Sequence, residues 1–255
     1  MGTLIPALMQ ENFVDDYLKV LALAAMPALG NFIGAWLTDI VNVSQRTLSL
    51  ALHSAAGVAL AVVSIELMPR VLRADPPWLV VLAFVAGGAF FILIDHFIGL
   101  MRALAGTEIE SAPLAIFFGV AVDLFSDGVM VGTGSTISIG LGLLLALGQL
   151  PANMPEGFAT IAAFKRQRLS RRKRLALAAS LSVAVPLGAS IGYWVVRDQP
   201  EIVKLVLLSF TSGILVTVVV EEMIPAAHEG GDAQFATAVF VGGFALFTLL
   251  SVYLG

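Results

Sequence analysis

The chain has 255 residues, of which 58% are hydrophobic and 13% are charged, and its formal net charge is −4. A soluble domain has about 45–50% apolar and about 25% charged residues, so this composition excludes an ordinary soluble globular protein. The chain contains no cysteine, which excludes disulfide frameworks and thiolate metal sites. Lipid is therefore the expected surrounding of most of its surface.

Predominantly apolar stretches of about 20 residues are long enough to cross the roughly 30 Å hydrocarbon core of a bilayer as helices. Eight such stretches occur, near residues 18–38, 48–69, 78–100, 112–133, 138–164, 175–196, 202–225 and 234–254. The connections between them are short. We therefore predict an all-α, polytopic membrane protein of eight transmembrane helices, with a single transmembrane domain over residues 1–255.

One connection, at residues 165–174, holds seven of the 14 Lys and Arg residues of the chain. Cytoplasmic connections of membrane proteins carry an excess of basic residues, so this one is predicted to be cytoplasmic. Counting helices in both directions then places both termini outside, in an inner or plasma membrane. Arg70 and Arg73 fall on the predicted outer side and oppose this orientation weakly.

Three consecutive helices occur twice in the sequence. In the first helix of each set, LGxxIGxW at 29–36 matches the same pattern at 187–194. In the second, Gly57, Glu66 and Pro69 match Gly213, Glu222 and Pro225, and in the third, FVAG at 84–87 matches FVGG at 240–243. Their separations are 158, 156 and 156 residues. A displacement of five helices reverses the crossing direction, which is the inverted repeat of many secondary transporters. We predict a 3+2+3 inverted repeat: repeat one at about 18–100, central helices at about 112–164 and repeat two at about 175–254.

The two central helices carry the polar residues that are most costly in a membrane. Asp123 and Asp127 are one turn apart on the first helix, and Gln149, Asn153 and Glu156 share a face of the second. An unpaired charge at this depth costs at least about 2.5–3.5 kcal/mol, and neither stretch contains Lys or Arg. A bound cation would neutralise the carboxylates. Protonated carboxylates that hydrogen-bond the two helices together are the alternative interpretation.

Two segments on the central helices have the form of a transporter motif. Residues 123–128 read DLFSDG, and residues 152–157 read ANMPEG. Further similar segments are HSAAGVALAVVSIELMP at 53–69, VPLGASIG at 185–192 and EEMIPAAH at 221–228. Over most of its length the chain resembles the ZIP (Zrt/Irt-like) family of divalent metal transporters. The resemblance implies a transporter rather than an enzyme, with eight spans and both termini outside.

The chain departs from the family pattern at four positions. Asp123 stands where members commonly have His, and Ala152 stands where they have His or Gln. Leu124 replaces an Asn, and Val185 replaces a Glu that many members have. The resemblance with these changes implies one main metal site instead of a binuclear centre, and its ligands are Asp123, Asp127, Asn153 and Glu156. Imidazole suits Zn²⁺, whereas all-oxygen ligands suit harder ions such as Mn²⁺ and Mg²⁺.

Other polar residues are candidates for additional metal contacts or gates. Glu66, toward the outer end of its helix, and Glu222, toward the inner end of its own, are equivalent in the repeat and could be entrance and exit carboxylates. Interaction with headgroup water is the alternative for both. The remaining candidates are Gln149, Glu221 and a group expected at inner helix ends, namely His53, Asp95, His96 and His228.

The leading functional prediction is a carrier that moves divalent cations into the cytoplasm by alternating access through a midplane site. The alternatives are an intramembrane metalloenzyme acting on lipid or peptide, with Glu156 as general base, and a passive metal channel or sensor. The ion is expected as substrate, and Zn²⁺, Mn²⁺, Fe²⁺ and Cd²⁺ all stay open. The expected partners are divalent cations and the lipid bilayer, without nucleic acid. The sequence leaves a homodimer open.

Overall fold

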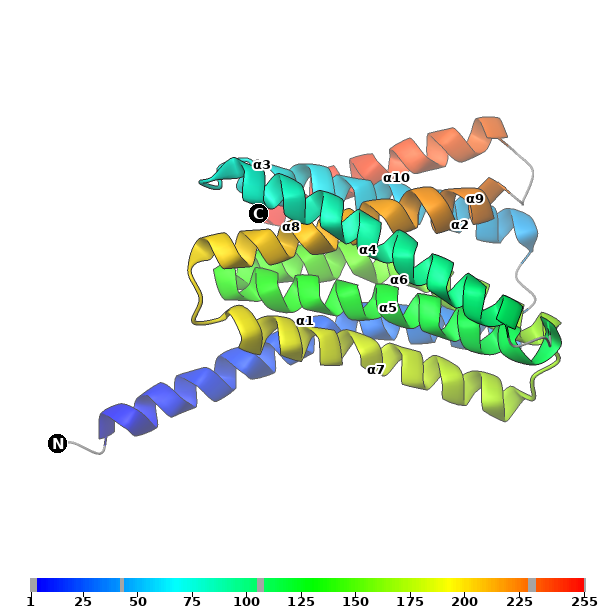
Figure 1. Cartoon of the computed structure of the whole chain (residues 1–255), viewed down its shortest axis with the longest axis horizontal. Helices are drawn as coiled ribbons and strands as arrows, with labels where there is room; N and C mark the ends of the chain where they lie inside the picture. Colours follow the sequence, from blue (N-terminus) through cyan, green and yellow to red (C-terminus); the bar gives the residue numbers. More distant parts are fainter. Residues whose placement is uncertain (1–3, 42–43, 105–107, 229–232, 255) are drawn as a thin grey trace.

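The computed structural model describes the backbone of residues 4–41, 44–104, 108–228 and 233–254, and its elements in these ranges are all helical. The α-helices are α1 (Leu4–Ile40), α2 (Gln45–Ala61), α3 (Met68–Val71), α4 (Pro77–Leu104), α5 (Glu108–Ile137), α6 (Ile139–Arg166), α7 (Arg171–Val196), α8 (Glu201–Val218), α9 (Ile224–His228) and α10 (Ala233–Leu254). Two π-helical turns, Val62–Leu67 and Val219–Met223, join α2 to α3 and α8 to α9. Because each of these trios is continuous, the described chain forms the eight predicted rods (Figure 1).

Seven of these rods, within the described residues, are long and apolar enough to cross a membrane. The eighth is α6, whose mean hydropathy is lowered by Gln149, Asn153 and Glu156. The rods agree closely with the predicted stretches except at α1, which begins at Leu4 rather than near residue 18. Apolar composition marks the part of a helix that crosses lipid and not the point where the helix begins, which explains the difference.

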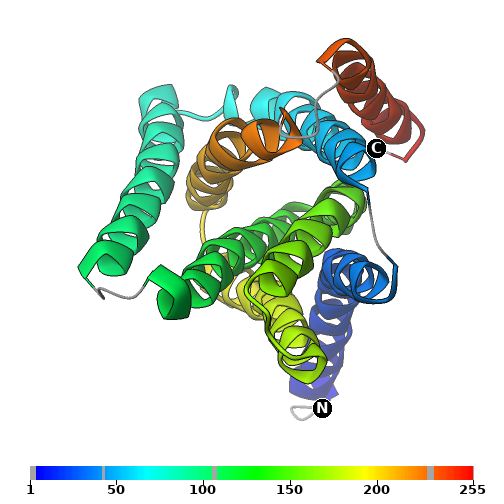
Figure 2. The ribbon, with the colours of Figure 1, turned by 90° about the vertical axis from the view of Figure 1, so that its right-hand side faces the viewer.

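The two central helices of the sequence, α5 and α6, also lie at the centre of the bundle (Figure 2). Around them α1 packs against α6 and α7 against α5, while α2 packs against α10 and α8 against α4. Each contact of the first repeat thus has a counterpart in the second. At the periphery, α4 and α10 bury only 17% and 22% of their most apolar windows, so most of their surface is available to lipid.

Glycines allow the matched helices to approach closely at equivalent positions. A Cβ added at Gly30 on α1 would collide with the backbone carbonyl of Leu150 on α6. At Gly188 on α7 it would collide with the carbonyl of Phe125 on α5. Small residues are what permits such backbone contact between membrane helices. Since α1 and α7 also run in opposite directions (Figure 1), packing and direction both agree with the inverted repeat.

The bundle has two distinct ends. Leu4 of α1 and Leu254 of α10 lie at the same end, which we call the terminal end (Figure 1). The connection between α6 and α7, with its basic residues, lies at the opposite end, which we call the basic end. α5 runs from the basic end to the terminal end, and α6 returns.

Candidate metal site

The facing of the polar residues on α5 and α6 is as the helical spacing predicts. Asp123 and Asp127 are each 3% exposed, and Gln149 and Asn153 are 2% and 1% exposed. Glu156, the fifth member, is partly buried. α6 continues through both of its prolines as one helix, so the three α6 side chains keep their common face. The predicted polar cluster is therefore assembled in the interior, between two helices that contact each other.

Gln149 acts on the cluster by hydrogen bonding. Its Nε2 donates to Oδ1 of Asp127 over 3.0 Å and lies 3.6 Å from the sulfur of the fully buried Met130. This bond fixes the direction of the Asp127 carboxylate. Gln149 therefore orients a neighbouring carboxylate through its amide nitrogen, and its amide oxygen is left for another partner.

Several buried oxygens of the cluster have no hydrogen-bond partner in the described part of the chain. These atoms are Oδ1 of Asp123, Oε1 of Gln149, Oδ1 of Asn153 and Oε2 of Glu156. Leaving a buried polar atom unsatisfied costs about 1–3 kcal/mol, and native proteins rarely do so without a reason. These four atoms are acceptors, whereas Nδ2 of Asn153, which also has no partner in the described structure, is a donor. A cation is the kind of partner that such a set of oxygens fits.

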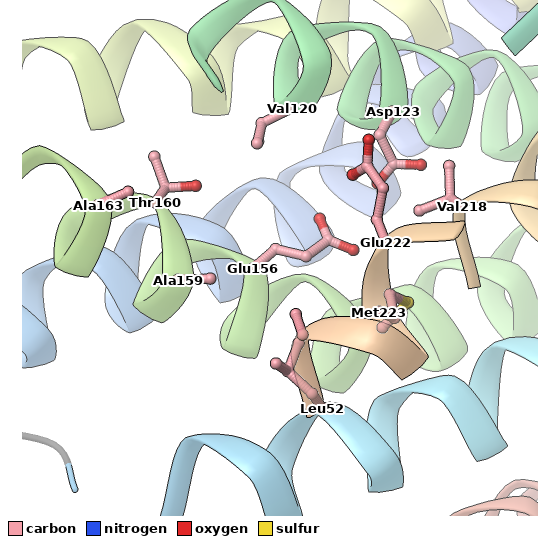
Figure 3. A pocket seen from close by; sticks show the side chains of 11 residues that line it. Leu52, Val120, Asp123, Glu156, Ala159, Thr160, Ala163, Val218, Glu222 and Met223 are labelled. Carbon is pink, nitrogen blue, oxygen red and sulfur yellow. The ribbon is translucent and has the colours of Figure 1, made fainter. Parts of the chain in front are cut away.

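A cavity of about 190 Å³ leads to this cluster from the basic end. Asp123 and Glu156 line its inner part, and Thr160 and Ala163 continue the lining along α6 toward the basic end. Figure 3 shows the carboxylates of Asp123, Glu156 and Glu222 directed to the same part of the cavity. In this conformation no three His, Asp or Glu side chains of the described residues are close enough to hold one ion.

The two equivalent glutamates of the repeat have different surroundings. Glu222 lines the cavity, whereas Glu66 is 6% exposed and has its own partners. Ser251 donates a hydrogen bond to Oε1 of Glu66, and the guanidinium of Arg70 lies 3.6 Å from Oε2. The structure thus brings only Glu222 of this pair to the cluster.

The partners of Glu66 have no equivalent in the second repeat. At the separation of 156 residues, Arg70 corresponds to Ala226, which lines the cavity. Ser251 corresponds to Asp95, whose charge acts on Glu222. At the terminal end a glutamate is therefore paired with an arginine, and at the basic end its equivalent is left facing the cavity.

The other predicted candidates are only partly brought together. The rings of His53 and His228 are neighbours, with centroids 5.0 Å apart. Asp95 and His96 are exposed on α4, and Glu221 is exposed beside Glu222 without lining the cavity. Of the group expected at inner helix ends, the structure brings His53 and His228 together, whereas Asp95 and His96 lie on the peripheral helix α4.

Leu124 and Val185 are both fully buried and belong to one apolar cluster. Residues of α1, among them Val20 and Ala24, complete that cluster. The positions where the family pattern has further oxygen ligands are thus filled with hydrocarbon here.

Sequence reasoning missed Thr160. It is 2% exposed, lines the cavity and leaves its hydroxyl without a partner in the described structure. The signal was available, because Thr160 continues by one more turn the helix face of Asn153 and Glu156.

These features define an integral membrane protein with an oxygen-rich site buried between its two central helices. A family model described as ZIP Zinc transporter matches residues 102–251. Zinc transporter ZupT of Chlorobium limicola is 28% identical over 254 residues, covering 90% of this chain and 96% of the relative. The proteins of the same name from Escherichia coli and Streptococcus mutans are 25% and 23% identical over 92% and 87% of the chain, covering 98% and 92% of those relatives.

The chain belongs to the ZIP family of zinc transporters, as its motifs predict. It is a divalent metal transporter and not an enzyme, which removes the metalloenzyme alternative.

Proposed function

We propose that the chain moves divalent cations into the cytoplasm by alternating access, and that Asp123, Asp127, Asn153 and Glu156 bind the ion on its way. The observation that carries this proposal is the set of buried, unpartnered oxygens on Asp123, Asn153 and Glu156. They lie at the inner part of a cavity that continues toward one end of the bundle. Oxygen acceptors without a donor are what a partly dehydrated cation needs as ligands.

The closed terminal side supports alternating rather than continuous access. Between the cluster and the terminal end the helices are filled by a large apolar core that includes Met130, Leu141 and Leu145. Glu66 is held there by Arg70 and Ser251. The inverted repeat supplies two similar halves that can exchange conformations around a fixed site. In the alternative conformation the terminal side opens and the basic side closes.

The basic connection between α6 and α7 supports the direction of transport. Seven Lys and Arg residues at 165–174 favour the cytoplasmic side for the basic end, with both termini outside. The cavity therefore faces the cytoplasm in this conformation, in an inner or plasma membrane. An ion that leaves Glu156 along this cavity passes Glu222 and enters the cytoplasm.

Uptake into proteoliposomes tests the proposed function. Wild-type protein should carry Zn²⁺ or Mn²⁺ inward at a rate that saturates with ion concentration. Preloading the vesicles with unlabelled ion should accelerate entry of labelled ion, since a carrier returns faster when it is loaded. Saturable uptake without this acceleration would indicate a channel instead, and binding without uptake would indicate a sensor.

Arg70 should act as a competitor of the entering ion. Its guanidinium neutralises Glu66, so an ion that uses Glu66 as its entrance carboxylate must displace it. The Arg70 side chain is 42% exposed, and pairs with such exposure contribute about 1 kcal/mol or less. Arg70→Ala should therefore lower the ion concentration for half-maximal uptake by about two- to fivefold. Arg73→Ala, in the same segment, is the control that should leave it unchanged. A higher half-maximal concentration in Arg70→Ala would contradict the entrance role of Glu66.

A further inference from the structure

The histidine pair lies beside the cavity but outside the cluster of oxygens. His53 on α2 is 4% exposed, whereas His228, the last residue of α9, is exposed. Leu52, which is adjacent to His53, and Ala226, two residues before His228, line the cavity. Since α9 ends at the basic end of the bundle, the pair flanks the route between the central site and that end (Figure 1).

In both imidazoles Nδ1 forms a hydrogen bond with a backbone carbonyl. Nδ1 of His53 lies 2.8 Å from the carbonyl oxygen of Ser49, and Nδ1 of His228 lies 2.7 Å from that of Ile224. A carbonyl only accepts, so each Nδ1 is the donor, and in the neutral ring the Nε2 atom then keeps its lone pair. Metal-binding histidines have this arrangement, in which the other ring nitrogen donates to a backbone carbonyl or carboxylate.

The spacing of the rings also suits one shared ion. With a Zn–N bond of about 2.0–2.1 Å and a tetrahedral angle, two imidazoles on one ion have centroids about 5 Å apart. The observed separation is 5.0 Å. The two helices are tied together here, because the Ser49 hydroxyl donates to the carbonyl of Ala227. The spacing is therefore a property of the helix packing and not of one mobile side chain.

We propose that His53 and His228 form a second metal site, which binds Zn²⁺ or a similar borderline ion through their Nε2 atoms. Water completes the coordination. The metal binding itself stands apart from transport, and only its role in release rests on the proposed function. With two protein ligands the site binds an ion weakly. Weak binding suits a transient site from which the ion is released to the cytoplasm.

The ligand chemistry distinguishes this site from the central one. Carboxylate and amide oxygens favour hard cations, whereas imidazole favours Zn²⁺ over Mn²⁺ and Mg²⁺. A Zn²⁺ ion leaving the oxygen site would therefore meet nitrogen ligands beside the cavity, and Mn²⁺ would pass them with little retention. The pair thus adds discrimination that the central oxygens lack.

Histidine-selective ¹⁵N NMR tests the site directly, because the chain has three histidines and the third, His96, is an internal control. The sample is full-length Glu156→Gln protein, in which the central site is disabled. Titration with Zn²⁺ should shift the Nε2 signals of His53 and His228 together and leave those of His96 in place. His53→Gln or His228→Gln should remove the shift of the remaining partner, whereas His96→Gln should preserve both shifts.

Equilibrium dialysis of Zn²⁺ against the same proteins gives the second readout. Either substitution in the pair should weaken binding by at least about tenfold, because loss of even an outer-shell partner of a metal ligand typically costs about that much. Because His228 is exposed, its substitution leaves the core intact and keeps the test valid if His53→Gln fails to fold. Unchanged Zn²⁺ binding and unshifted His53 and His228 signals would overturn the proposal. If wild-type protein fails to transport but the shifts occur, the proposed function fails and this site stands.

Discussion

Glu156→Ala will abolish uptake of divalent cations. The Glu156 carboxylate lines the inner part of the cavity, and one of its oxygens has no protein partner in the described structure. An ion in the closed site has no water with which to replace the lost negative charge. Removing one partner of a buried charge pair costs about 3–5 kcal/mol, so uptake should fall by more than about a hundredfold.

Two further variants separate this loss from a folding defect. Glu156→Gln keeps the size of the side chain and removes its charge, so it should be folded and equally inactive. Glu201→Ala removes an exposed acid at the start of α8 and should retain uptake. Rates are measured in proteoliposomes at equal amounts of inserted protein. Wild-type uptake by Glu156→Gln would mean that the ion does not use this carboxylate.

Asp123→His will shift the ion preference toward Zn²⁺. Asp123 lines the cavity, so the larger imidazole has about 190 Å³ of space beside it. It would add a nitrogen ligand to a set that otherwise contains only oxygens, and nitrogen ligands favour Zn²⁺ over Mn²⁺. We expect Zn²⁺ to gain roughly tenfold over Mn²⁺ relative to wild type, where Mn²⁺ competes well.

Competition between labelled Zn²⁺ and unlabelled Mn²⁺, Fe²⁺ or Cd²⁺ measures this shift. Asp123→Asn is the matched control, because it also loses the charge but provides no imidazole. It should weaken uptake of all four ions without favouring Zn²⁺. A wild type that already strongly prefers Zn²⁺ or Cd²⁺, together with an unchanged preference in Asp123→His, would show that the ligand at position 123 does not set selectivity.

The fold was predictable because apolar length, repeated motifs and helical spacing all indicate the same arrangement of helices. Apolar length predicts the eight rods. The matched glycine motifs predict which helices pack equivalently, since Gly30 and Gly188 make the same kind of close backbone contact with α6 and α5. The facing of Asp123 and Asp127 follows from helical geometry alone. These features depend on local spacing, which a sequence displays directly.

The unequal roles of Glu66 and Glu222 could not be predicted in the same way. The motifs around them are alike, and the difference depends partly on Ser251, which is 185 residues from Glu66 in the chain. Arg70, four residues after Glu66, is the visible signal, but its charge alone indicates only weak opposition to the predicted orientation. In the structure Arg70 forms an ion pair with Glu66. The approach of His53 to His228 likewise depends on helix packing that the sequence does not display.

The central claim is that the transported ion binds among the oxygens of α5 and α6. Anomalous X-ray diffraction from crystals of the wild-type protein grown with Mn²⁺ tests it most directly. The account predicts a metal peak within about 2.0–2.6 Å of oxygens from at least three of the four residues Asp123, Asp127, Asn153 and Glu156. A fully occupied Mn²⁺ peak elsewhere, with these four side chains free of metal, would contradict it.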